Sequence, residues 1–547
     1  MIDMTIGQYL DYIASKYPDQ DALIFEDKVR YSYRILKEIS NRLAKGLLKI
    51  GIKKGDHVAI WATNIPEWVV TLFATAKIGA PLVSINTAYK EHEVEYILRQ
   101  SDARALVLID GFKDSDYIKT LYNLVPELKH SSKGILRSSK FPELKAVIYI
   151  GNKELPGVYK YEEIMELGST VDDDELYSVQ RSINAHEVID IQYTSGTTGF
   201  PKGAMLTHYN LLNNGDAIAS RMNFTTADRL CIPVPLFHCF GYTLSIMACL
   251  SKGSTMVLVD HFNPLAVMNA IQRERCTAVH GVPTMFITML EHPDFENYDF
   301  SSLRTGIMAG SVCPIKVMRA VVDRMNIKEI TSVYGLTEAS PGITQTSVYD
   351  SLEDRVTTVG YALPEIEVKI VDPATGCEVP RGVQGEVMAR GYNVMKGYYK
   401  MPEETEKVIE PDGWLHTGDI GVMDERGYLT ITGRLKDMII RGGENISPRE
   451  IEEYLYHHPY IKDVQVVGVP DEKYGEEIMA YVIPKEGHIL TEEEVIEYAK
   501  AGLARFKVPK YVRFLDRFPM TASGKIQKYV LREMGAKDIC SQNSYIR

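Results

Sequence analysis

Helical patterns alternate with short runs of β-branched residues in the first part of this chain, and this alternation most limits the folds it can adopt. The stretch "VEYILRQSDARALVLID" predicts a helix that ends near Ser101, followed by a buried strand from Ala105 to Ile109. Helices that alternate with strands are typical of an α/β architecture. We therefore expect the first part of the chain to form α/β subdomains.

The later sequence predicts two further kinds of structure. "EIEVKIVDP" and "GEVMARG" have the period-two pattern of short strands, and "ERGYLTITGR" adds a strand after a turn. Beyond Gly433, a helix should begin near Ser447 as its N-cap, with Pro448 in its first turn, and paired strands should follow. We expect an α/β protein with a large domain over residues 1–433, made of α/β subdomains plus a β-rich subdomain, and a small mobile α+β domain over residues 434–547.

Acidic residues outnumber basic ones in this chain. It has 61 lysines and arginines and 73 aspartates and glutamates, so its formal charge is −12 at pH 7. Such a chain, without a concentrated basic patch, is not expected to bind nucleic acid.

The seven cysteines are odd in number, widely spaced and never in a C-x-x-C pair, which supports neither a disulfide framework nor a zinc site. A reducing, cytoplasmic location fits this pattern best.

One segment without charged residues runs from Leu230 to Ser251 and is long enough to span a bilayer. Pro233 and Pro235 interrupt it, and a Pro-x-Pro pair cannot continue a helix without losing backbone hydrogen bonds. We therefore expect a buried core segment and no transmembrane helix.

The N-terminal sequence has early acids and no uninterrupted apolar run, so it predicts neither a signal peptide nor a transit sequence.

The stretch "YTSGTTGFPKGAMLTH" has the composition of a phosphate-binding loop. Residues 194–203 contain three glycines, four hydroxyl side chains and one lysine, with no carboxylate. Such loops bring backbone N–H groups close to a phosphate, while a lysine at the rim adds a point charge. The spacing is not that of a Walker loop, because Lys202 follows Gly199 by three positions and is itself followed by Gly203.

The sequence around this loop leaves a second interpretation open. Glycine, serine and threonine would also suffice for a flexible surface linker. After the loop, "AMLTH" predicts a short strand, and Thr207 should cap a helix that starts near Asn210. The loop alone therefore favours phosphate only modestly, and other motifs must decide.

Five motifs in order resemble the signature series of the AMP-forming acyl-CoA synthetases. These enzymes belong to the adenylate-forming superfamily, which includes firefly luciferase and the adenylation domains of peptide synthetases. The motifs are "YTSGTTGFPKG", "YGLTE", "GWLHTGD", "GRLKDMIIRGGENISPREIE" and "PMTASGKIQK". The resemblance covers nearly the whole chain and looks most like the medium-chain fatty acyl-CoA synthetase branch.

The resemblance implies a reaction in two halves. A carboxylate attacks the α-phosphorus of ATP to give acyl-AMP and pyrophosphate, and the thiol of CoA then displaces AMP. ATP, Mg²⁺ and CoA are therefore the expected cofactor and cosubstrates. Both halves develop negative charge on oxygen atoms, so catalysis should rest on positioning and on cations or N–H groups aimed at the phosphates.

The resemblance also assigns the nucleotide site. The β- and γ-phosphates would be held by Thr194, Ser195, Gly196, Thr197, Thr198, Gly199 and Lys202. Glu338 would be the magnesium ligand, because a hard carboxylate suits a cation shared with substrate phosphates. Thr337 would contact the α-phosphate, Tyr334 would lie on adenine beside Gly335, and Gly310 and Ser311 would lie next to the adenine and the acyl group.

The remaining assignments concern the ribose and the small domain. Asp419 would accept hydrogen bonds from both ribose hydroxyls, and Arg434 would close over the same sugar. Lys525 would reach the α-phosphate and carboxylate oxygens, a role that needs a long point donor. Together with Lys202, Thr337 and Glu338, it completes the implied catalytic set. Rotation about Lys436 would then bring Gly442 and Gly443 to line the CoA channel, where a glycine lets pantetheine pass close to the backbone.

The acyl pocket is implied to lie between two apolar segments, "PLFHCFGYTLSIM" and "VHGVPTMFITML". Both are rich in Met, Phe or Tyr, so an apolar acid is expected. His238 and Gly310 are its candidate polar-end residues, although a buried structural histidine is an equal alternative for His238. The expected substrate is a medium-chain fatty acid, with long-chain and aryl acids still open.

Other functions share the same motifs. The enzyme could load a separate carrier protein instead of CoA, act as a luciferase-like oxygenase, or bind ligands without catalysis. The complete set of Lys202, Glu338, Asp419, Arg434 and Lys525 argues against the last of these. An oligomer is possible, and the expected partners are a small carboxylic acid, ATP and CoA.

Overall fold

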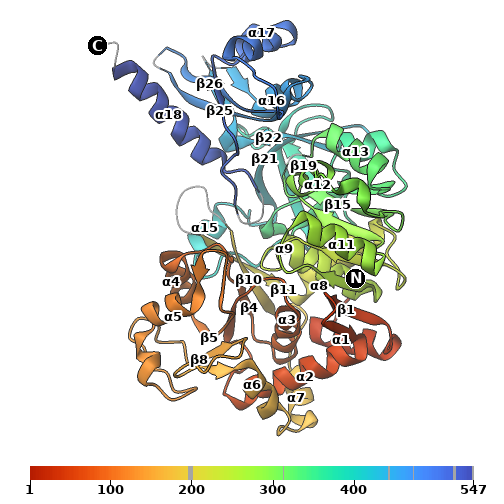
Figure 1. Cartoon of the computed structure of the whole chain (residues 1–547), viewed down its shortest axis with the longest axis vertical. Helices are drawn as coiled ribbons and strands as arrows, with labels where there is room; N and C mark the ends of the chain where they lie inside the picture. Colours follow the sequence, from red (N-terminus) through yellow and green to blue (C-terminus); the bar gives the residue numbers. More distant parts are fainter. Residues whose placement is uncertain (195–200, 312, 442–443, 472, 522–524, 545–547) are drawn as a thin grey trace. The chain divides into compact units, whose positions relative to one another are not determined.

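Two folded units share the chain, and each contains residues from two separate stretches. The computed structural model describes residues 1–547 except 195–200, 312, 442–443, 472, 522–524 and 545–547. Unit 1 comprises Met1–Glu367 and Ala389–Leu415, and unit 2 comprises Val368–Met388 and His416–Arg547. The two units are described separately below (Figure 1).

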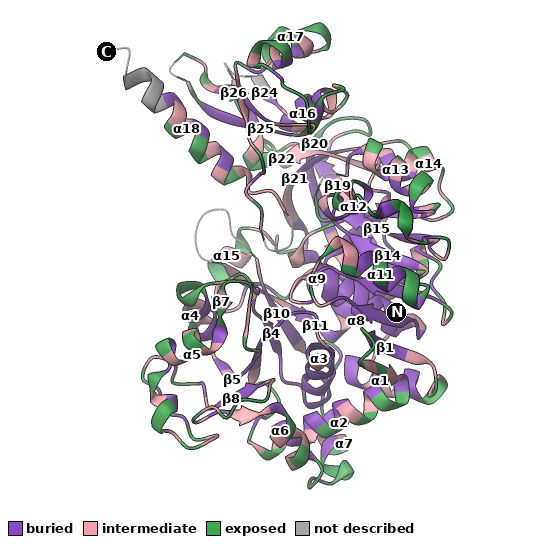
Figure 2. Cartoon of the chain, viewed as in Figure 1, coloured by how far each residue is buried: buried purple, intermediate pink, exposed green. Residues whose placement is uncertain are grey.

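A nine-stranded sheet in unit 1 has the order β18-β17-β16-β15-β14-β12-β13-β1-β2. The six central strands, β16, β15, β14, β12, β13 and β1, pair in parallel. Antiparallel strands lie at both edges, β17 and β18 beside β16 and β2 beside β1. The strands are β1 (Asp21–Phe25), β2 (Val29–Ser32), β12 (Arg229–Ile232), β13 (Thr255–Leu258), β14 (Ala278–Gly281), β15 (Thr305–Ala309), β16 (Glu329–Gly335), β17 (Gly342–Gln345) and β18 (Tyr361–Ala362). The parallel strands are almost wholly buried, as expected of a sheet covered on both faces (Figure 2).

A seven-stranded sheet in the same unit has the order β11-β10-β4-β3-β5-β8-β9. Its strands are β3 (His57–Trp61), β4 (Leu82–Ser84), β5 (Ala103–Leu108), β8 (Ala146–Tyr149), β9 (Tyr159–Lys160), β10 (Val188–Thr194) and β11 (Lys202–Thr207). Helix α4 (Glu91–Gln100) ends with Ser101 as its C-cap, as predicted. The predicted strand is also confirmed, although β5 begins two residues earlier than expected.

Helices cover these sheets. In unit 1 they are α1 (Ile6–Lys16), α2 (Tyr33–Lys49), α3 (Pro66–Ile78), α4, α5 (Tyr117–Leu124), α6 (Tyr161–Gly168), α7 (Asp173–Arg181), α8 (His208–Arg221), α11 (Pro264–Glu274), α12 (Pro283–Leu290), α13 (Ile315–Arg324) and α14 (Leu352–Thr357). α2 packs against α3 and α6, while α11 and α12 contribute to an apolar core around β14 and β15. Because α3 is buried on nearly every side, most of its residues are apolar, and Glu67 and Lys77 are its charged residues.

The start of α8 differs from the prediction. Thr207 is the N-cap, as expected, and its hydroxyl accepts a hydrogen bond from the Asn210 backbone N–H at 3.1 Å. The Asn210 side chain in turn accepts a hydrogen bond from the Thr207 N–H at 2.8 Å. This reciprocal capping box places Asn210 at the third helical position, so the helix begins at His208 and not near Asn210.

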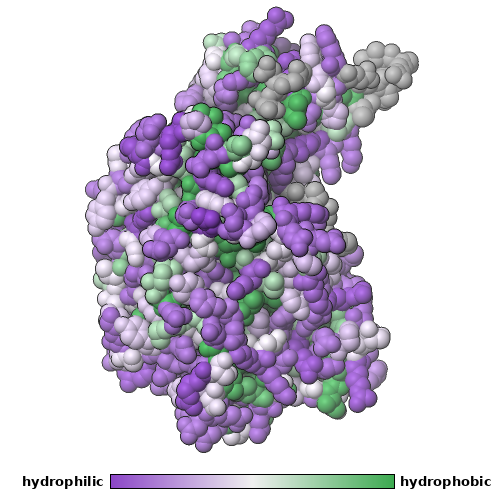
Figure 3. Space-filling model, turned by 180° about the vertical axis from the view of Figure 1, so that it is seen from behind, coloured by the Kyte–Doolittle hydropathy of each residue, from purple (hydrophilic) through white to green (hydrophobic). Residues whose placement is uncertain are grey.

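The uncharged segment from Leu230 to Ser251 is buried inside unit 1, which confirms it as a core segment. It contributes to β12 and then forms α9 (Cys239–Gly241), the π-helix η2 (Tyr242–Met247) and α10 (Ala248–Lys252). In the described part of the chain, no helix combines the length and apolar character that a membrane crossing requires. On the face seen in Figure 3, hydrophobic residues are scattered among hydrophilic ones.

Six cysteines have described side chains, and none of them forms a disulfide bond with another described residue. They are Cys231, Cys239, Cys249, Cys276, Cys313 and Cys377, of which the first four are buried.

Unit 2 contains most of a four-stranded sheet and all of a five-stranded sheet. The first has the order β19-β20-β21-β22, from β19 (Ile366–Val371), β20 (Gly385–Gly391), β21 (Leu415–Met423) and β22 (Leu429–Arg434). The second has the order β24-β23-β26-β25 with β27 beside β26, from β23 (Ile439–Arg441), β24 (Glu444–Ile446), β25 (Ile461–Asp471), β26 (Gly475–Pro484) and β27 (Tyr511–Phe514). Helices α16 (Pro448–Tyr456), α17 (Glu492–Gly502) and α18 (Lys528–Ser544) complete the unit. The predicted α/β class, with a β-rich part followed by a small α+β part, is confirmed.

The predicted start of α16 is correct, but its cap works differently. Ser447 is the N-cap residue and Pro448 begins the helix. However, the Ser447 hydroxyl makes no cap hydrogen bond and instead donates to the carbonyl of Thr432 in β22. The serine therefore ties the start of α16 to β22.

Candidate functional site

The predicted site residues divide between the two units. Unit 1 contains Thr194, Lys202, His238, Gly310, Ser311, Tyr334, Gly335, Thr337 and Glu338, whereas unit 2 contains Asp419, Arg434, Lys436 and Lys525. The predicted residues Ser195, Gly196, Thr197, Thr198, Gly199, Gly442 and Gly443 lie outside the described part of the chain. The residues of each unit are therefore described within that unit.

The glycine-rich loop joins two antiparallel strands. Thr194 is the last residue of β10 and Lys202 the first of β11, and the two residues are register partners across the hairpin. Lys202 is therefore fixed at the base of the loop. Its ammonium forms an ion pair with Glu404, on the short helix α15 (Pro402–Glu406), and lies 5.1 Å from the ring centre of Tyr398.

The segment that carries Tyr398 runs along β11. The Met205 N–H donates to the Gly397 carbonyl at 2.9 Å, and the Tyr399 N–H donates to the Gly203 carbonyl at 2.8 Å. On its other side, the Tyr398 hydroxyl donates to Glu338 Oε1 at 2.7 Å. One tyrosine thus contacts both the lysine predicted to bind phosphate and the predicted magnesium ligand.

Charge and burial set the protonation states in this cluster. Burial, followed by the nearby Glu338 carboxylate, raises the pKa of Tyr398 far above its ordinary value, so the phenol stays a hydrogen-bond donor. The hydrogen bond from Lys202, followed by one from Lys407, lowers the pKa of Glu404 to about 2. At neutral pH, Glu404 is therefore a carboxylate between two ammonium groups.

The surroundings of Glu338 fit a magnesium ion that is shared with a nucleotide. The side chain is half-buried, Tyr398 holds Oε1, and no described residue donates a hydrogen bond to Oε2. The described residues contain no group of three or more His, Cys, Asp or Glu side chains that could hold a metal. Mg²⁺ at such a site takes most of its ligands from phosphates and water, which matches a single protein carboxylate.

Several other predicted residues follow the carboxyl ends of neighbouring parallel strands. Gly310 follows β15, while Tyr334 and Gly335 end β16, which continues into the 3₁₀ turn η4 (Thr337–Ala339). β15 and β16 pair in parallel, so these ends lie at the same edge of the sheet. That edge is where open α/β sheets bind ligands. At Gly335, a Cβ atom would lie 1.7 Å from the Pro341 carbonyl oxygen, so only glycine fits there.

His238 lies beside the same edge. It precedes α9, and its Nδ1 accepts a hydrogen bond from the Phe240 N–H at 3.2 Å, so the neutral ring carries its proton on Nε2. The adjacent Cys239 sulfur lies 3.6 Å from the Thr337 hydroxyl oxygen. His238 is half-buried, and its side chain caps the N-terminus of α9. The pocket role and the structural role of this histidine therefore both remain predictions.

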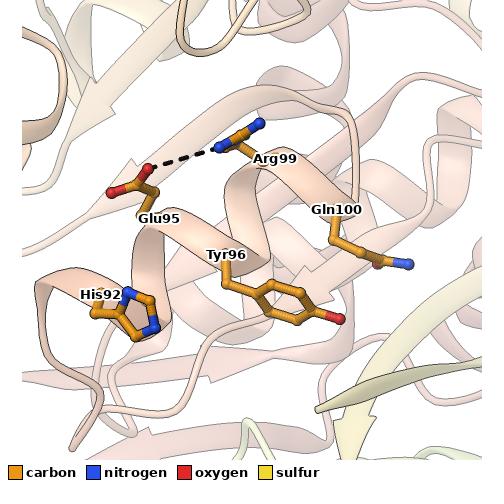
Figure 4. Close-up of a pocket in the computed structure, with 5 residues that line it drawn as sticks. All are labelled: His92, Glu95, Tyr96, Arg99 and Gln100. Atoms are coloured by element: carbon orange, nitrogen blue, oxygen red, sulfur yellow. Dashed lines mark ion pairs between the residues drawn. The ribbon is translucent and has the colours of Figure 1, made fainter. Parts of the chain in front are cut away.

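Helix α4 also contacts the hairpin. A cavity of about 400 Å³ is lined on α4 by His92, Glu95, Tyr96, Arg99 and Gln100, whose side chains project from the helix (Figure 4). The Tyr96 hydroxyl donates to the Pro201 carbonyl at 3.0 Å, and Gln100 contacts the Tyr193 hydroxyl. α4 therefore positions both ends of the glycine-rich loop.

In unit 2, Asp419 and Arg434 form one pair. They are register partners on the antiparallel strands β21 and β22, and Arg434 Nε lies 2.9 Å from Asp419 Oδ1. The Asp419 side chain is only 6% exposed, whereas that of Arg434 is 51% exposed. A fixed carboxylate next to a movable guanidinium suits an acid that accepts hydrogen bonds from two sugar hydroxyls and an arginine that closes over them.

Lys436 and Lys525 occupy two further positions in unit 2. Lys436 is exposed in the short 3₁₀ turn η5 (Leu435–Asp437), between β22 and β23. Lys525 is half-buried, and its backbone is fixed by two contacts with Thr521: the Thr521 N–H donates to the Lys525 carbonyl at 2.7 Å, and the Lys525 N–H donates to the Thr521 hydroxyl at 3.1 Å.

The sequence analysis missed Tyr398 and Glu404. Their segment, "MKGYYKMPEETEK", contains paired tyrosines and a cluster of acids, which was the only available signal. Their roles depend on pairing with β11, far away in the sequence, so no local pattern could reveal them.

Comparison with known proteins agrees with this geometry. Residues 10–399 match the AMP-binding enzyme family, and residues 450–525 match the AMP-binding enzyme C-terminal domain. The "Putative acyl-CoA synthetase YngI" of Bacillus subtilis is 56% identical over 97% of this chain and 97% of its own. The mitochondrial medium-chain acyl-CoA ligase ACSF2 of Danio rerio is 43% identical over 98% of this chain and 89% of its own.

Solved structures show the same relationship. The anthranilate CoA ligase AuaEII in complex with anthranoyl-AMP superposes with a TM-score of 0.85 at 25% identity, covering 99% of both chains. ATP-bound MatB from Rhodopseudomonas palustris superposes with a TM-score of 0.83 at 29% identity, covering 97% of this chain and 99% of MatB. The chain therefore belongs to the AMP-binding enzyme family and is an ATP-binding, adenylate-forming acyl-CoA synthetase.

Proposed function

We propose that this acyl-CoA synthetase activates medium-chain fatty acids and transfers the acyl group to CoA in the cytoplasm. The observation that carries the substrate class is the 43% identity, over nearly the full length, to a relative named as a medium-chain acyl-CoA ligase. The apolar character of the two candidate pocket segments supports the same class.

These two segments meet at a buried polar contact. The Ser245 hydroxyl, on the π-helix η2, donates to the Phe240 carbonyl at 3.0 Å and lies 3.2 Å from His280 Nδ1 on β14. Since the serine proton is already used, His280 Nδ1 donates to the Ser245 oxygen. Burial lowers the pKa of His280 to about 3, so the ring is neutral at physiological pH. If these segments line the acyl pocket, as the resemblance implies, an uncharged contact at this position favours an acid with an uncharged tail.

In the first half-reaction, the residues of unit 1 would orient the phosphates. Lys202 would place one ammonium on the β- and γ-phosphate oxygens, together with the loop from Thr194 onward. Thr337 would contact the α-phosphate, and the Nε2–H of His238 is a suitable donor for the substrate carboxylate. Glu338 would hold the magnesium ion, whose chemistry is to neutralise charge on the phosphates. These contributions are positional and electrostatic, as charge development on oxygen requires.

The residues of unit 2 would complete the site. Asp419 and Arg434 would hold the ribose, and Lys525 would contact the α-phosphate and the carboxylate oxygens. We propose that residues 434–547 act as a mobile lid on an AMP-binding domain of residues 1–433, with its hinge near Lys436. After rotation, Gly442 and Gly443 would line the CoA channel. Such closure also limits hydrolysis of the reactive adenylate.

The test is AMP release with ATP, magnesium and CoA across straight-chain acids from acetate to palmitate, with benzoate and a cinnamate added and CoA omitted in a control. We expect a CoA-dependent maximum at intermediate chain lengths. A maximum at palmitate would indicate a long-chain fatty acid as the substrate, and a maximum at benzoate or the cinnamate would indicate an aryl acid. Adenylate formation without any CoA ester would make a carrier protein the acceptor.

A further inference from the structure

Glu404 forms ion pairs with two lysines. Its Oε2 atom contacts the Lys202 ammonium and its Oε1 atom contacts that of Lys407. The Glu404 side chain is 32% exposed and that of Lys202 is 22% exposed, so water reaches both only in part. Neither Glu404 nor Lys407 belongs to the nucleotide site as assigned above.

The backbone around Glu404 is well anchored, which makes the contact with Lys202 a fixed feature. The Thr405 hydroxyl accepts a hydrogen bond from the Tyr398 N–H at 2.9 Å and donates to the Met401 carbonyl at 2.9 Å. Tyr398 is in turn bridged to Ala204 of β11. α15 is therefore attached to the strand that Lys202 begins, and the carboxylate is presented to that lysine.

Two anions cannot share this ammonium at low cost. A lysine has three donors on one compact charge, and a phosphate oxygen beside the Glu404 carboxylate would place like charges a few ångströms apart. The role proposed for Lys202 brings phosphate oxygens to the same ammonium that Glu404 Oε2 now contacts. Nucleotide binding should therefore open this ion pair, while Lys407 still contacts Oε1 and holds the displaced carboxylate.

We propose that Glu404 is a positioning residue that holds the Lys202 ammonium when no nucleotide is bound and is displaced by the phosphates of ATP. This inference rests on the proposed phosphate-binding role of Lys202. This counter-ion fixes the orientation of the lysine side chain but weakens phosphate binding. It should equally speed the departure of pyrophosphate, because Glu404 competes for the cation that pyrophosphate leaves.

The test measures binding of the α,β-methylene analogue of ATP with MgCl₂ to the full-length enzyme by calorimetry. Glu404→Gln removes the competing charge, and we expect its Kd to fall about two- to five-fold, the range given by a partly exposed ion pair. Glu403→Gln is the matched control, because it removes the same charge from an exposed neighbour on the same helix. Its Kd should match that of the wild type.

A double-mutant cycle separates the proposal from a general change in electrostatic field. In a Lys202→Ala background, Glu404→Gln should leave the Kd unchanged. If Glu404→Gln tightens binding no more than Glu403→Gln, or acts equally without Lys202, the counter-ion role is wrong. Glu404→Asp, which keeps the charge but shortens the side chain, should fall between the wild type and Glu404→Gln. If Glu404→Gln does not fold, Glu404→Ser replaces it in the same comparisons.

The failure of this inference is distinguishable from failure of the proposed function. If Lys202→Ala alone leaves the Kd unchanged, Lys202 is not a phosphate ligand, and both proposals fail at that residue. If Lys202→Ala weakens binding but Glu404→Gln does not tighten it, the phosphate role stands and only the counter-ion role is refuted. As a kinetic check, Glu404→Gln should lower KM for ATP and, where product release limits turnover, also lower kcat.

Discussion

Replacing Tyr398 with phenylalanine would test how the candidate magnesium ligand is positioned. The change removes one hydroxyl, which donates to Glu338 Oε1 at 2.7 Å, and keeps the ring beneath the Lys202 ammonium. The backbone pairing of this segment with β11 does not involve the hydroxyl. The substitution therefore isolates the orientation of a single carboxylate.

The magnitude follows from the kind of hydrogen bond that is lost. Hydrogen bonds to a charged acceptor contribute about 1.5–3 kcal/mol, and water can partly replace the hydroxyl at a half-buried glutamate. The lower end, about 1.5 kcal/mol, corresponds to a change of about ten-fold in an equilibrium constant. We expect Tyr398→Phe to raise the Mg²⁺ concentration needed for half-maximal activity by about this factor.

The assay is the ATP–pyrophosphate exchange rate at a fixed ATP concentration across a magnesium titration. Tyr399→Phe is the matched control, because the Tyr399 hydroxyl donates to another carboxylate, Asp102 Oδ2, at 2.8 Å. It should reduce stability to a similar extent without moving the magnesium midpoint. An unchanged midpoint in Tyr398→Phe, or an equal shift in Tyr399→Phe, would refute the reasoning.

Three further predictions concern groups elsewhere in the fold. Asp190 is fully buried, and burial raises its pKa, although the nearby Gln192 side chain acts in the opposite direction. Neither carboxylate oxygen has a described hydrogen-bond partner at normal geometry. Because the folded pKa exceeds the unfolded one, the free energy of unfolding falls as pH rises between the two values, so Asp190→Asn should be more stable than the wild type in urea at pH 7 but not at pH 4. Lys77 is fully buried with its ammonium 2.6 Å from Asp11 Oδ1, and burial lowers its pKa to about 8. Asp11→Asn leaves this cation without its partner and should lower the free energy of unfolding by about 3–5 kcal/mol. A loss below about 1 kcal/mol would show that the two residues do not form a buried charge pair. Lys525→Ala should abolish adenylation and spare thioester formation from supplied acyl-AMP, and equal loss of both half-reactions would contradict its assigned role.

Features set by neighbouring residues were predictable from the sequence. The end of α4 at Ser101 and the cap at Thr207 depend on side chains within one helical turn, so local patterns identify them. Even there, the predicted start of α8 near Asn210 was two residues late. Asn210 is the third residue of the helix, and its side chain accepts a hydrogen bond from the N–H of the cap residue Thr207. The Ser447 hydroxyl also escaped prediction, since its partner Thr432 lies on another element.

Residues that balance the charges of a site are harder to predict than the residues that perform its chemistry. Lys202 and Glu338 stand in short motifs, as expected if a phosphate and a metal demand particular groups at fixed positions. A half-buried cation or anion, however, is costly unless another group satisfies it before the ligand arrives. Tyr398 and Glu404 meet that requirement in unit 1, and they do so through a segment whose only link to both motifs is its pairing with β11. A motif therefore predicts the ligand, while on our proposal the packing around the motif sets how strongly that ligand binds.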